Sequence, residues 1–261
     1  MRYPTVLTIA GSDSCGGAGI QADIKTISSL GVYACSAITA ITSQNTTGVR
    51  SIQGIDPNIL KDQIEAVFED MKIDAVKSGM LYSKDSVEAI ADCLKRFSPK
   101  YYVLDPVMVS TSGSKLITDE AIEAVREMLF PLATLITPNI EEVRVLTGIS
   151  VKSVDDMQRA AEALLDCGCN AVLMKGGHLD GDESVDMLFE KGKKDNHFFI
   201  KNITHTFKNV IKSIIGIVYV KKFCCLRNFT YLCRRFKRGR RGFPYRSSNR
   251  ESMQCVLYDE D

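Results

Sequence analysis

The sequence contains no apolar run that approaches the roughly 18 consecutive residues of a membrane span. Its N-terminus leads straight into a predicted strand, without the pattern of a signal peptide. It also lacks the G-x-G-x-x-G pattern of dinucleotide-binding loops and the G-x-x-x-x-G-K-[ST] pattern of P-loops. We therefore expect a cytoplasmic protein with no membrane partner, and ordinary NAD or Walker-type sites are disfavoured.

Cysteine patterns that bind metal are absent as well. The nine cysteines are scattered and odd in number, and Cys167-x-Cys169 and Cys224-Cys225 have neither the spacing nor the partners of a zinc site. We interpret the cysteines as buried free thiols in a reducing compartment.

The composition is that of a globular chain, but the charge is divided unevenly. The 261 residues are 45% hydrophobic and 25% charged, enough for one or two domains with a core that needs no disulfide or metal. Residues 201–261 hold 14 of the 33 basic residues and 4 of the 32 acidic ones, a net charge of +10, which leaves −9 for residues 1–200. This change predicts a core domain over 1–200 and an atypical basic segment over 201–261.

Short apolar strands alternate with amphipathic helices up to about residue 190. Such alternation predicts an α/β fold with a mainly parallel sheet and helices on both faces. Residues 45–55 alternate differently and carry two glycines, which predicts a small β-flap at the edge of the sheet, with an ordinary connecting hairpin as the alternative. The predicted strands are 5–10, 34–42, 75–77, 101–104, 135–136 and 171–174, and the predicted helices are about 20–30, 57–70, 83–97, 118–129, 139–147 and 155–167.

A glycine-rich turn links the first strand to the first helix. Gly16, Gly17 and Gly19 allow sharp turns and close approach to a ligand, so the turn offers backbone N–H groups, with the carboxylate of Asp23 nearby. A purely structural turn explains the same pattern equally well.

Three further clusters follow predicted strands, where a parallel sheet places its ligand crevice. Asp105 comes directly after one strand and is suited to hold magnesium or its waters. Asn139 and Glu142 are three residues apart and share one face of a helix, where they either orient a hydrated cation or cap the helix. Lys175 ends another strand before two glycines, a pattern suited to a phosphate. Together they favour phosphoryl transfer from a nucleotide.

These clusters belong to longer stretches over residues 3–190 that resemble the hydroxymethylpyrimidine/phosphomethylpyrimidine kinases of thiamine biosynthesis, in the ribokinase-like superfamily. The stretches are LTIAGSDSCGGAGIQADIKT (7–26), ITAITSQNTTGV (38–49), KSGML (77–81), VLDPVM (103–108), LITPNIEE (135–142) and LMKGGHLDGDESVDML (173–188). The resemblance implies a ribokinase-like three-layer α/β/α fold, use of ATP and Mg²⁺, and a homodimer through the flap.

The resemblance also implies roles for individual residues. Gln44 would bind the pyrimidine, because an amide donates and accepts along a heterocycle edge, and it separates the chain from the related pyridoxal kinases. Gly11, Ala18, Asp23, Met80 and Val107 complete the implied substrate site. On the nucleotide side, Asn139 and Glu142 match the N-x-x-E magnesium–phosphate motif, beside Asp105, Lys175 and Gly176, with Asp105 and Glu142 holding the metal through water.

The resemblance stops before the C-terminus. The family's T-H-G-[TA]-G-[CD] motif should follow about residue 200, where its N–H groups form an anion hole and its last residue is the base. This chain has NITHTFKN at 202–209 instead, so the catalytic base is unassigned. We favour a frameshifted or mispredicted C-terminus, because the composition changes in the same part of the chain where the resemblance to the family ends. The alternatives are a divergent end and an arm that binds nucleic acid or a membrane surface, neither of which we expect as a partner.

The leading hypothesis is therefore an ATP-dependent kinase that acts on hydroxymethylpyrimidine and then on its monophosphate. The alternatives are a catalytically inactive pyrimidine-binding relic of that kinase, a pyridoxal or pyridoxine kinase, and an adaptor that binds nucleic acid through its basic tail.

Overall fold

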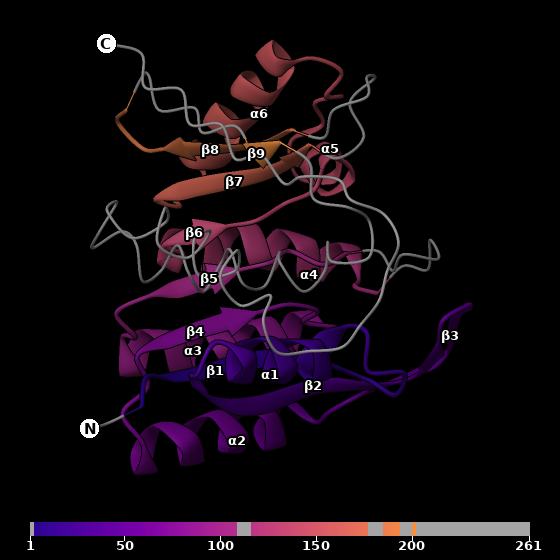
Figure 1. The fold of residues 1–261 in the computed structure, drawn as a ribbon, viewed down its shortest axis with the longest axis vertical. Coiled ribbons are helices and arrows are strands. Elements are labelled where there is room, and N and C mark those ends of the chain that lie inside the picture. Colours follow the sequence, from indigo (N-terminus) through magenta and orange to yellow (C-terminus); the bar gives the residue numbers. More distant parts are fainter. Residues whose placement is uncertain (1–2, 109–115, 177–184, 194–199, 202–261) are drawn as a thin grey trace, which may run out of the picture.

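A computed structural model describes residues 3–108, 116–176, 185–193 and 200–201. In this part of the chain, nine strands form one sheet with the order β3-β2-β1-β4-β5-β6-β7-β8-β9 (Figure 1). The pairs from β2 to β7 are parallel, whereas β3, β8 and β9 are joined antiparallel to their neighbours. The strands are β1 (Thr5–Asp13), β2 (Tyr33–Asn45), β3 (Gly48–Gly54), β4 (Ala75–Ser78), β5 (Tyr102–Leu104), β6 (Leu135–Ile136), β7 (Ala171–Gly176), β8 (Val185–Glu190) and β9 (Ile200–Lys201).

Most of the helices begin where a polar side chain caps them. The side chains of Asp56, Ser83, Thr118, Asn139 and Ser153 each accept a backbone N–H in the first turn, which satisfies donors that the helix leaves unpaired. The helices are α1 (Gly19–Ser29), α2 (Pro57–Asp70), α3 (Lys84–Phe97), α4 (Asp119–Ala124), α5 (Ile140–Thr147) and α6 (Val154–Asp166).

The helices pack on both faces of the sheet, as predicted. Successive strand residues point to opposite faces, so Val6 of β1 packs with Ile27 of α1 in one apolar cluster. Leu7 and Ile9 belong instead to the larger cluster, which contains the buried residues of α2, α3, α4, α5 and α6. The predicted α/β/α architecture is therefore confirmed.

The predicted elements agree with the structure in type and order, apart from β8 and β9, which were not predicted, and the end of one helix. The predicted flap is the antiparallel hairpin of β2 and β3. The predicted helix 118–129 is α-helical only to Ala124 and continues as a π-helical turn over Val125–Leu129, followed by a 3₁₀ turn that contains Pro131. Proline has no N–H to extend an α-helix.

The ends of the predicted domains fall partly outside the described residues. Strand β9 pairs with β8 at Ile200 and Lys201, across the boundary predicted between 200 and 201. Residues 202–261 are not described, so the interpretations of the basic segment stay predictions. No helix in the described ranges has the length and apolar character needed to cross a membrane.

The described cysteines are all free thiols. Cys35, Cys93 and Cys169 are buried, whereas Cys15 is exposed, which contradicts the prediction of burial for that residue. Burial raises the pKa of Cys93 to about 11 and that of Cys169 to about 12, so these thiols stay protonated.

Candidate active site

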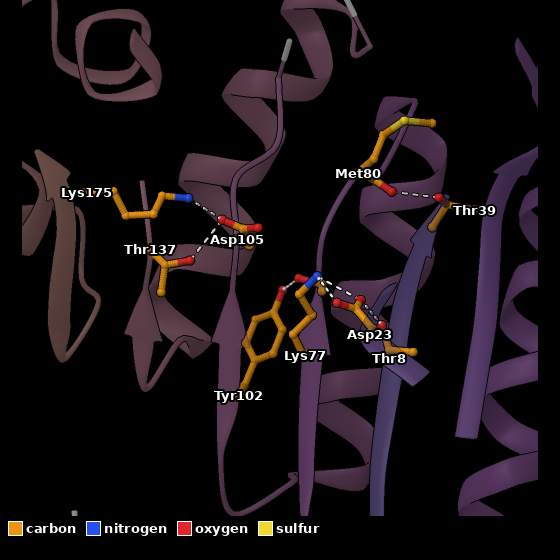
Figure 2. Close-up of polar contacts among 10 residues, drawn as sticks. Thr8, Asp23, Thr39, Lys77, Met80, Tyr102, Asp105, Thr137 and Lys175 are labelled. Atoms are coloured by element: carbon orange, nitrogen blue, oxygen red, sulfur yellow. Dashed lines mark hydrogen bonds and ion pairs between the residues drawn. The ribbon is translucent and has the colours of Figure 1, made fainter. Parts of the chain in front are cut away.

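Several of the predicted site residues lie at the carboxyl edge of the parallel strands, where α/β sheets bind ligands. Among the polar contacts in Figure 2, one group is centred on Asp23 and Lys77 and another on Asp105 and Lys175. The first group belongs to β1, β4 and α1, and the second lies at the ends of β5, β6 and β7.

The glycine-rich turn is organised by Asp13 at the end of β1. Its carboxylate accepts N–H groups from Cys15 (2.8 Å), Gly17 (2.9 Å) and Ala18 (2.8 Å), and its carbonyl accepts the N–H of Gly16 (2.9 Å). The prediction that the turn offers free N–H groups is therefore wrong at these four residues. A buried aspartate inside the turn already uses these donors.

Gly19 allows the turn to pack on β1. Its φ is +56°, and a Cβ at this position would lie 2.1 Å from the carbonyl oxygen of Gly11. Both the positive φ and the contact exclude a side chain. Gly11 in turn faces Met80, whose Cε would lie 3.0 Å from a Cβ at position 11.

The predicted substrate carboxylate, Asp23, takes part in a buried ion pair. It is 2% exposed, and it accepts hydrogen bonds from Lys77 Nζ at 2.8 and 3.0 Å and from Thr8 Oγ1 at 2.6 Å (Figure 2). The contact of Asp23 with an aminopyrimidine stays a prediction. Lys77 was not predicted, although a lysine within a buried strand signals a partner, because such a charge is rarely left unpaired.

A small apolar cluster brings together two predicted substrate residues, Met80 and Val107. Met80 packs in one cluster with Ala40 and Leu116, and Val107 contacts this cluster. The flap residues Val49 and Ile52 also contact it. The structure therefore places Gly11, Met80 and Val107 near one another beneath the flap, while Ala18 is exposed at the N-cap of α1.

Gln44 connects the flap to the glycine-rich turn. Its carbonyl accepts the hydroxyl of Ser14 at 2.6 Å, and its N–H donates to the same hydroxyl at 2.9 Å. Its side-chain oxygen accepts a long hydrogen bond from Thr42 Oγ1 at 3.4 Å. The residue is half-buried, and its predicted contact with the pyrimidine remains a prediction.

Tyr82 lies against the flap with an unusual backbone. Its φ is +72°, a left-handed conformation that is strained for a bulky residue. A Cβ on Gly54 would lie 2.2 Å from the ring, so the absence of a side chain at position 54 leaves room for Tyr82. The ring therefore fixes the base of β3 to the segment that follows β4.

The second group of contacts surrounds Lys175 at the end of β7. Its Nζ lies 2.9 Å from Asp105 Oδ1 and 3.9 Å from Glu142 Oε2, and Thr137 Oγ1 donates to the same Asp105 oxygen at 2.9 Å. Burial by itself raises the pKa of Asp105, but the charges of Lys175 and Lys77 and the two hydrogen bonds outweigh it and lower the pKa to about 2. Burial lowers the pKa of Lys175, but the two carboxylates outweigh it, so its pKa is raised.

Asn139 and Glu142 form a capping box at the start of α5. Asn139 Oδ1 accepts the N–H of Glu142 at 2.9 Å, and Glu142 Oε2 accepts the N–H of Asn139 at 2.7 Å. The capping interpretation is therefore confirmed, and a magnesium role for these residues stays a prediction. The N–H of Gly176 donates to Asp186 at 3.0 Å.

The donor set around Lys175 fits magnesium bound partly through water. Carboxylate and amide oxygens from Asp105, Glu142 and Asn139 are the ligand types that Mg²⁺ prefers. Within the described ranges, no group of three or more acidic, histidine or cysteine side chains is close enough to hold a metal. Waters and phosphate oxygens would therefore have to complete the shell.

Sequence comparison decides the family. The profile of the family described as phosphomethylpyrimidine kinase matches residues 13–207, well over half of the chain. The chain belongs to this family. Residues 11–190, which carry the site described above, fall almost wholly inside the match.

Relatives in the phosphomethylpyrimidine kinase family match the chain along most of its length. The hydroxymethylpyrimidine/phosphomethylpyrimidine kinase of Rhizobium meliloti is 50% identical over 185 residues, which are 70% of this chain and 69% of that protein. The thiamine biosynthesis bifunctional protein of Geobacter sulfurreducens is 50% identical over 186 residues, 71% of this chain but only 38% of that protein. The phosphomethylpyrimidine kinase structure from Clostridium difficile superposes with a TM-score of 0.73 at 49% identity, covering 82% of this chain and 91% of that one. The ribokinase-like fold is thereby confirmed.

Proposed function

We propose that this protein is an ATP-dependent kinase that phosphorylates hydroxymethylpyrimidine and then its monophosphate. The observation that carries the proposal is the placement of two chemically different half-sites on one sheet edge. An apolar cluster that contains Met80 lies beyond the end of β4, and the buried carboxylate of Asp23, on α1, pairs with Lys77 of β4, whereas a lysine–carboxylate cluster lies at the ends of β5 to β7. Phosphoryl transfer requires this juxtaposition of an acceptor with the phosphates of a nucleotide.

In the acceptor half, Met80 and Val107 pack against the pyrimidine ring, beside Gly11 and the flap. Gln44 hydrogen-bonds along the heterocycle edge, because its amide both donates and accepts. Asp23 accepts a hydrogen bond from the amino group. The flap, tied to Ser14 through Gln44, excludes water from the reacting groups.

In the nucleotide half, Lys175 turns from Asp105 toward the phosphates and stabilises the charge that develops during transfer. Gly176 lies beside the nucleotide. Asp105, Glu142 and Asn139 would hold Mg²⁺ partly through water, and the metal would neutralise charge on the phosphate oxygens. Because Lys175 is held by two carboxylates, its departure from one of them leaves the other within reach.

A second candidate is a pyrimidine-binding protein that has lost catalysis. The specific observation in its favour is the sequence NITHTFKN at 202–209, where the family motif with its glycines and terminal Cys or Asp is expected. These residues lie outside the described part of the chain, and the catalytic base is unassigned. Both candidate proteins bind the pyrimidine in the acceptor half, but only the kinase transfers a phosphoryl group to it.

The test measures ADP release by the full chain with hydroxymethylpyrimidine or its monophosphate and MgATP, with pyridoxal as the rival acceptor. Turnover of the two pyrimidines above that of pyridoxal supports the kinase. Calorimetry that detects pyrimidine binding without turnover supports the inactive relic, and preference for pyridoxal or binding of neither pyrimidine contradicts both.

Lys175→Met tests the nucleotide half directly. We expect about a 30-fold loss of MgADP affinity, roughly 2 kcal/mol, measured by calorimetry, with pyrimidine affinity unchanged. Lys61→Met removes the same charge from the exposed face of α2 and is the matched control. Equal MgADP affinity in the Lys175 variant and its control would remove Lys175 from the nucleotide site.

A further inference from the structure

Lys77 is a buried cation for which the proposed reaction has no use. It is 6% exposed and lies on β4, the strand between β1 and β5. A Cβ at position 79 would lie 3.1 Å from its Nζ, so the side chain extends along the strand to the level of Gly79, just beyond the carboxyl end of β4. The ammonium group therefore reaches the sheet edge that carries both half-sites.

The charge of Lys77 acts on both half-sites. On one side its Nζ contacts Asp23 at 2.8 and 3.0 Å. On the other side it is one of the charges that stabilise ionised Asp105. The carboxylates of Asp23, Asp105 and Glu142 lie beside two ammonium groups, Lys77 and Lys175, and the charge of Asp186 also acts on Lys175. Without Lys77, only Lys175 of these two ammonium groups would remain to compensate the four carboxylates.

This balance matters because the two acceptors of the proposed reaction differ in charge. The first is a neutral alcohol, whereas the second is a phosphate monoester that carries close to two negative charges at neutral pH. Carboxylates in a crevice of low dielectric repel such an anion far more strongly than they would in water. An added positive charge therefore favours the second acceptor and leaves binding of the first nearly unchanged.

We propose that Lys77 determines specificity for the phosphorylated acceptor: by compensating the carboxylates at the sheet edge, it lets one crevice bind both a neutral pyrimidine alcohol and its anionic monoester. This inference rests on the proposed function. A purely structural Lys77 would join β4 to α1 and would affect both acceptors equally.

The experiment measures by calorimetry, without nucleotide, the affinities of the full chain for hydroxymethylpyrimidine and its monophosphate. The readout is the ratio of the two dissociation constants, because effects common to both ligands cancel. Lys77→Met should weaken binding of the monophosphate about tenfold relative to binding of the alcohol. Asp23→Asn removes a negative charge instead and should shift the ratio severalfold in the opposite direction.

The combined variant Asp23→Asn/Lys77→Met restores the original charge balance, so its ratio should return to within about twofold of the unmodified chain. Lys61→Met, an exposed charge on α2, should leave the ratio unchanged. If Lys77→Met fails to fold, Asp23→Asn alone still tests the sign of the effect. Ratios that stay constant in every folded variant would overturn the inference, whereas an unmodified chain that binds neither ligand would overturn the proposed function along with it.

Discussion

Two lysine–aspartate pairs lie at the same sheet edge, and they differ in how completely each is enclosed. In the closed pair, Lys77–Asp23, the two side chains are 8% and 2% exposed. In the open pair, Lys175–Asp105, the lysine is 7% exposed but the carboxylate is 20% exposed, and the lysine also lies 3.9 Å from Glu142. The N···O distances, 2.8 and 2.9 Å, are nearly equal.

The comparison shows that ion-pair length says little about what a pair can do. A lysine whose hydrogen-bonded partner is enclosed leaves that partner only at high cost, because the separation would strand two desolvated charges. A lysine shared by two carboxylates, one of them reached by solvent, exchanges partners at lower cost. The closed pair is therefore suited to a fixed acceptor site, and the open pair to a nucleotide site that rearranges as phosphates arrive.

The largest expected difference appears when each carboxylate is removed. Asp23→Ala should lower the free energy of unfolding by about 3–5 kcal/mol, because it leaves Lys77 buried and unpaired. Asp105→Ala should cost about 1–2 kcal/mol, since Glu142 still compensates Lys175. Urea unfolding measures both, and Asp92→Ala on the exposed face of α3 should stay within about 0.5 kcal/mol. Equal losses of unfolding free energy in Asp23→Ala and Asp105→Ala would contradict the proposed difference between the closed and the open pair.

The open pair also predicts how stability depends on pH. The folded state holds the pKa of Asp105 at about 2, below its ordinary value of 3.8. Its contribution, about 2 kcal/mol, is therefore complete above about pH 5 and is lost as the pH falls toward 2. Denaturant unfolding between pH 2 and 5 should show this loss in the unmodified chain and a flatter profile in Asp105→Asn.

The control for this profile is Asp156→Asn. Asp156 caps α6, and hydrogen bonds from the Lys152 backbone, Arg159 and Ser153 lower its pKa to about 2 as well. If Asp156→Asn alone flattens the profile, the pH dependence belongs to the cap of α6 and not to the open pair.

The smallest difference concerns the threonine that supports each pair. Thr8→Val removes the 2.6 Å hydrogen bond to Asp23 and should cost about 1.5–2 kcal/mol, because the acceptor is charged and enclosed. Thr137→Val removes the 2.9 Å hydrogen bond to Asp105 and should cost about half as much, since water reaches that carboxylate. Thermal unfolding of the two variants gives the comparison; a larger cost at position 137 would contradict it.

Local patterns predicted the sheet, the helices and the position of Asp105 and Lys175 at strand ends, because alternation and capping residues act over a few neighbours. Such local patterns could not predict the closed pair, because Asp23 and Lys77 are 54 residues apart in the sequence. The hydrogen bonds from the loop N–H groups to Asp13 were not predicted, for a different reason. The glycine spacing indicates that the turn is tight, but it does not indicate what the turn surrounds.

The contact between Tyr82 and Gly54 links two positions that are distant in the sequence. Because the ring occupies the space of a side chain at 54, and because its strained backbone is held there, neither position is free to vary alone. A residue larger than glycine at 54 requires a smaller one at 82, and a smaller residue at 82 leaves the base of the hairpin without its support. Among relatives with a hairpin of the same length, the two positions should therefore covary.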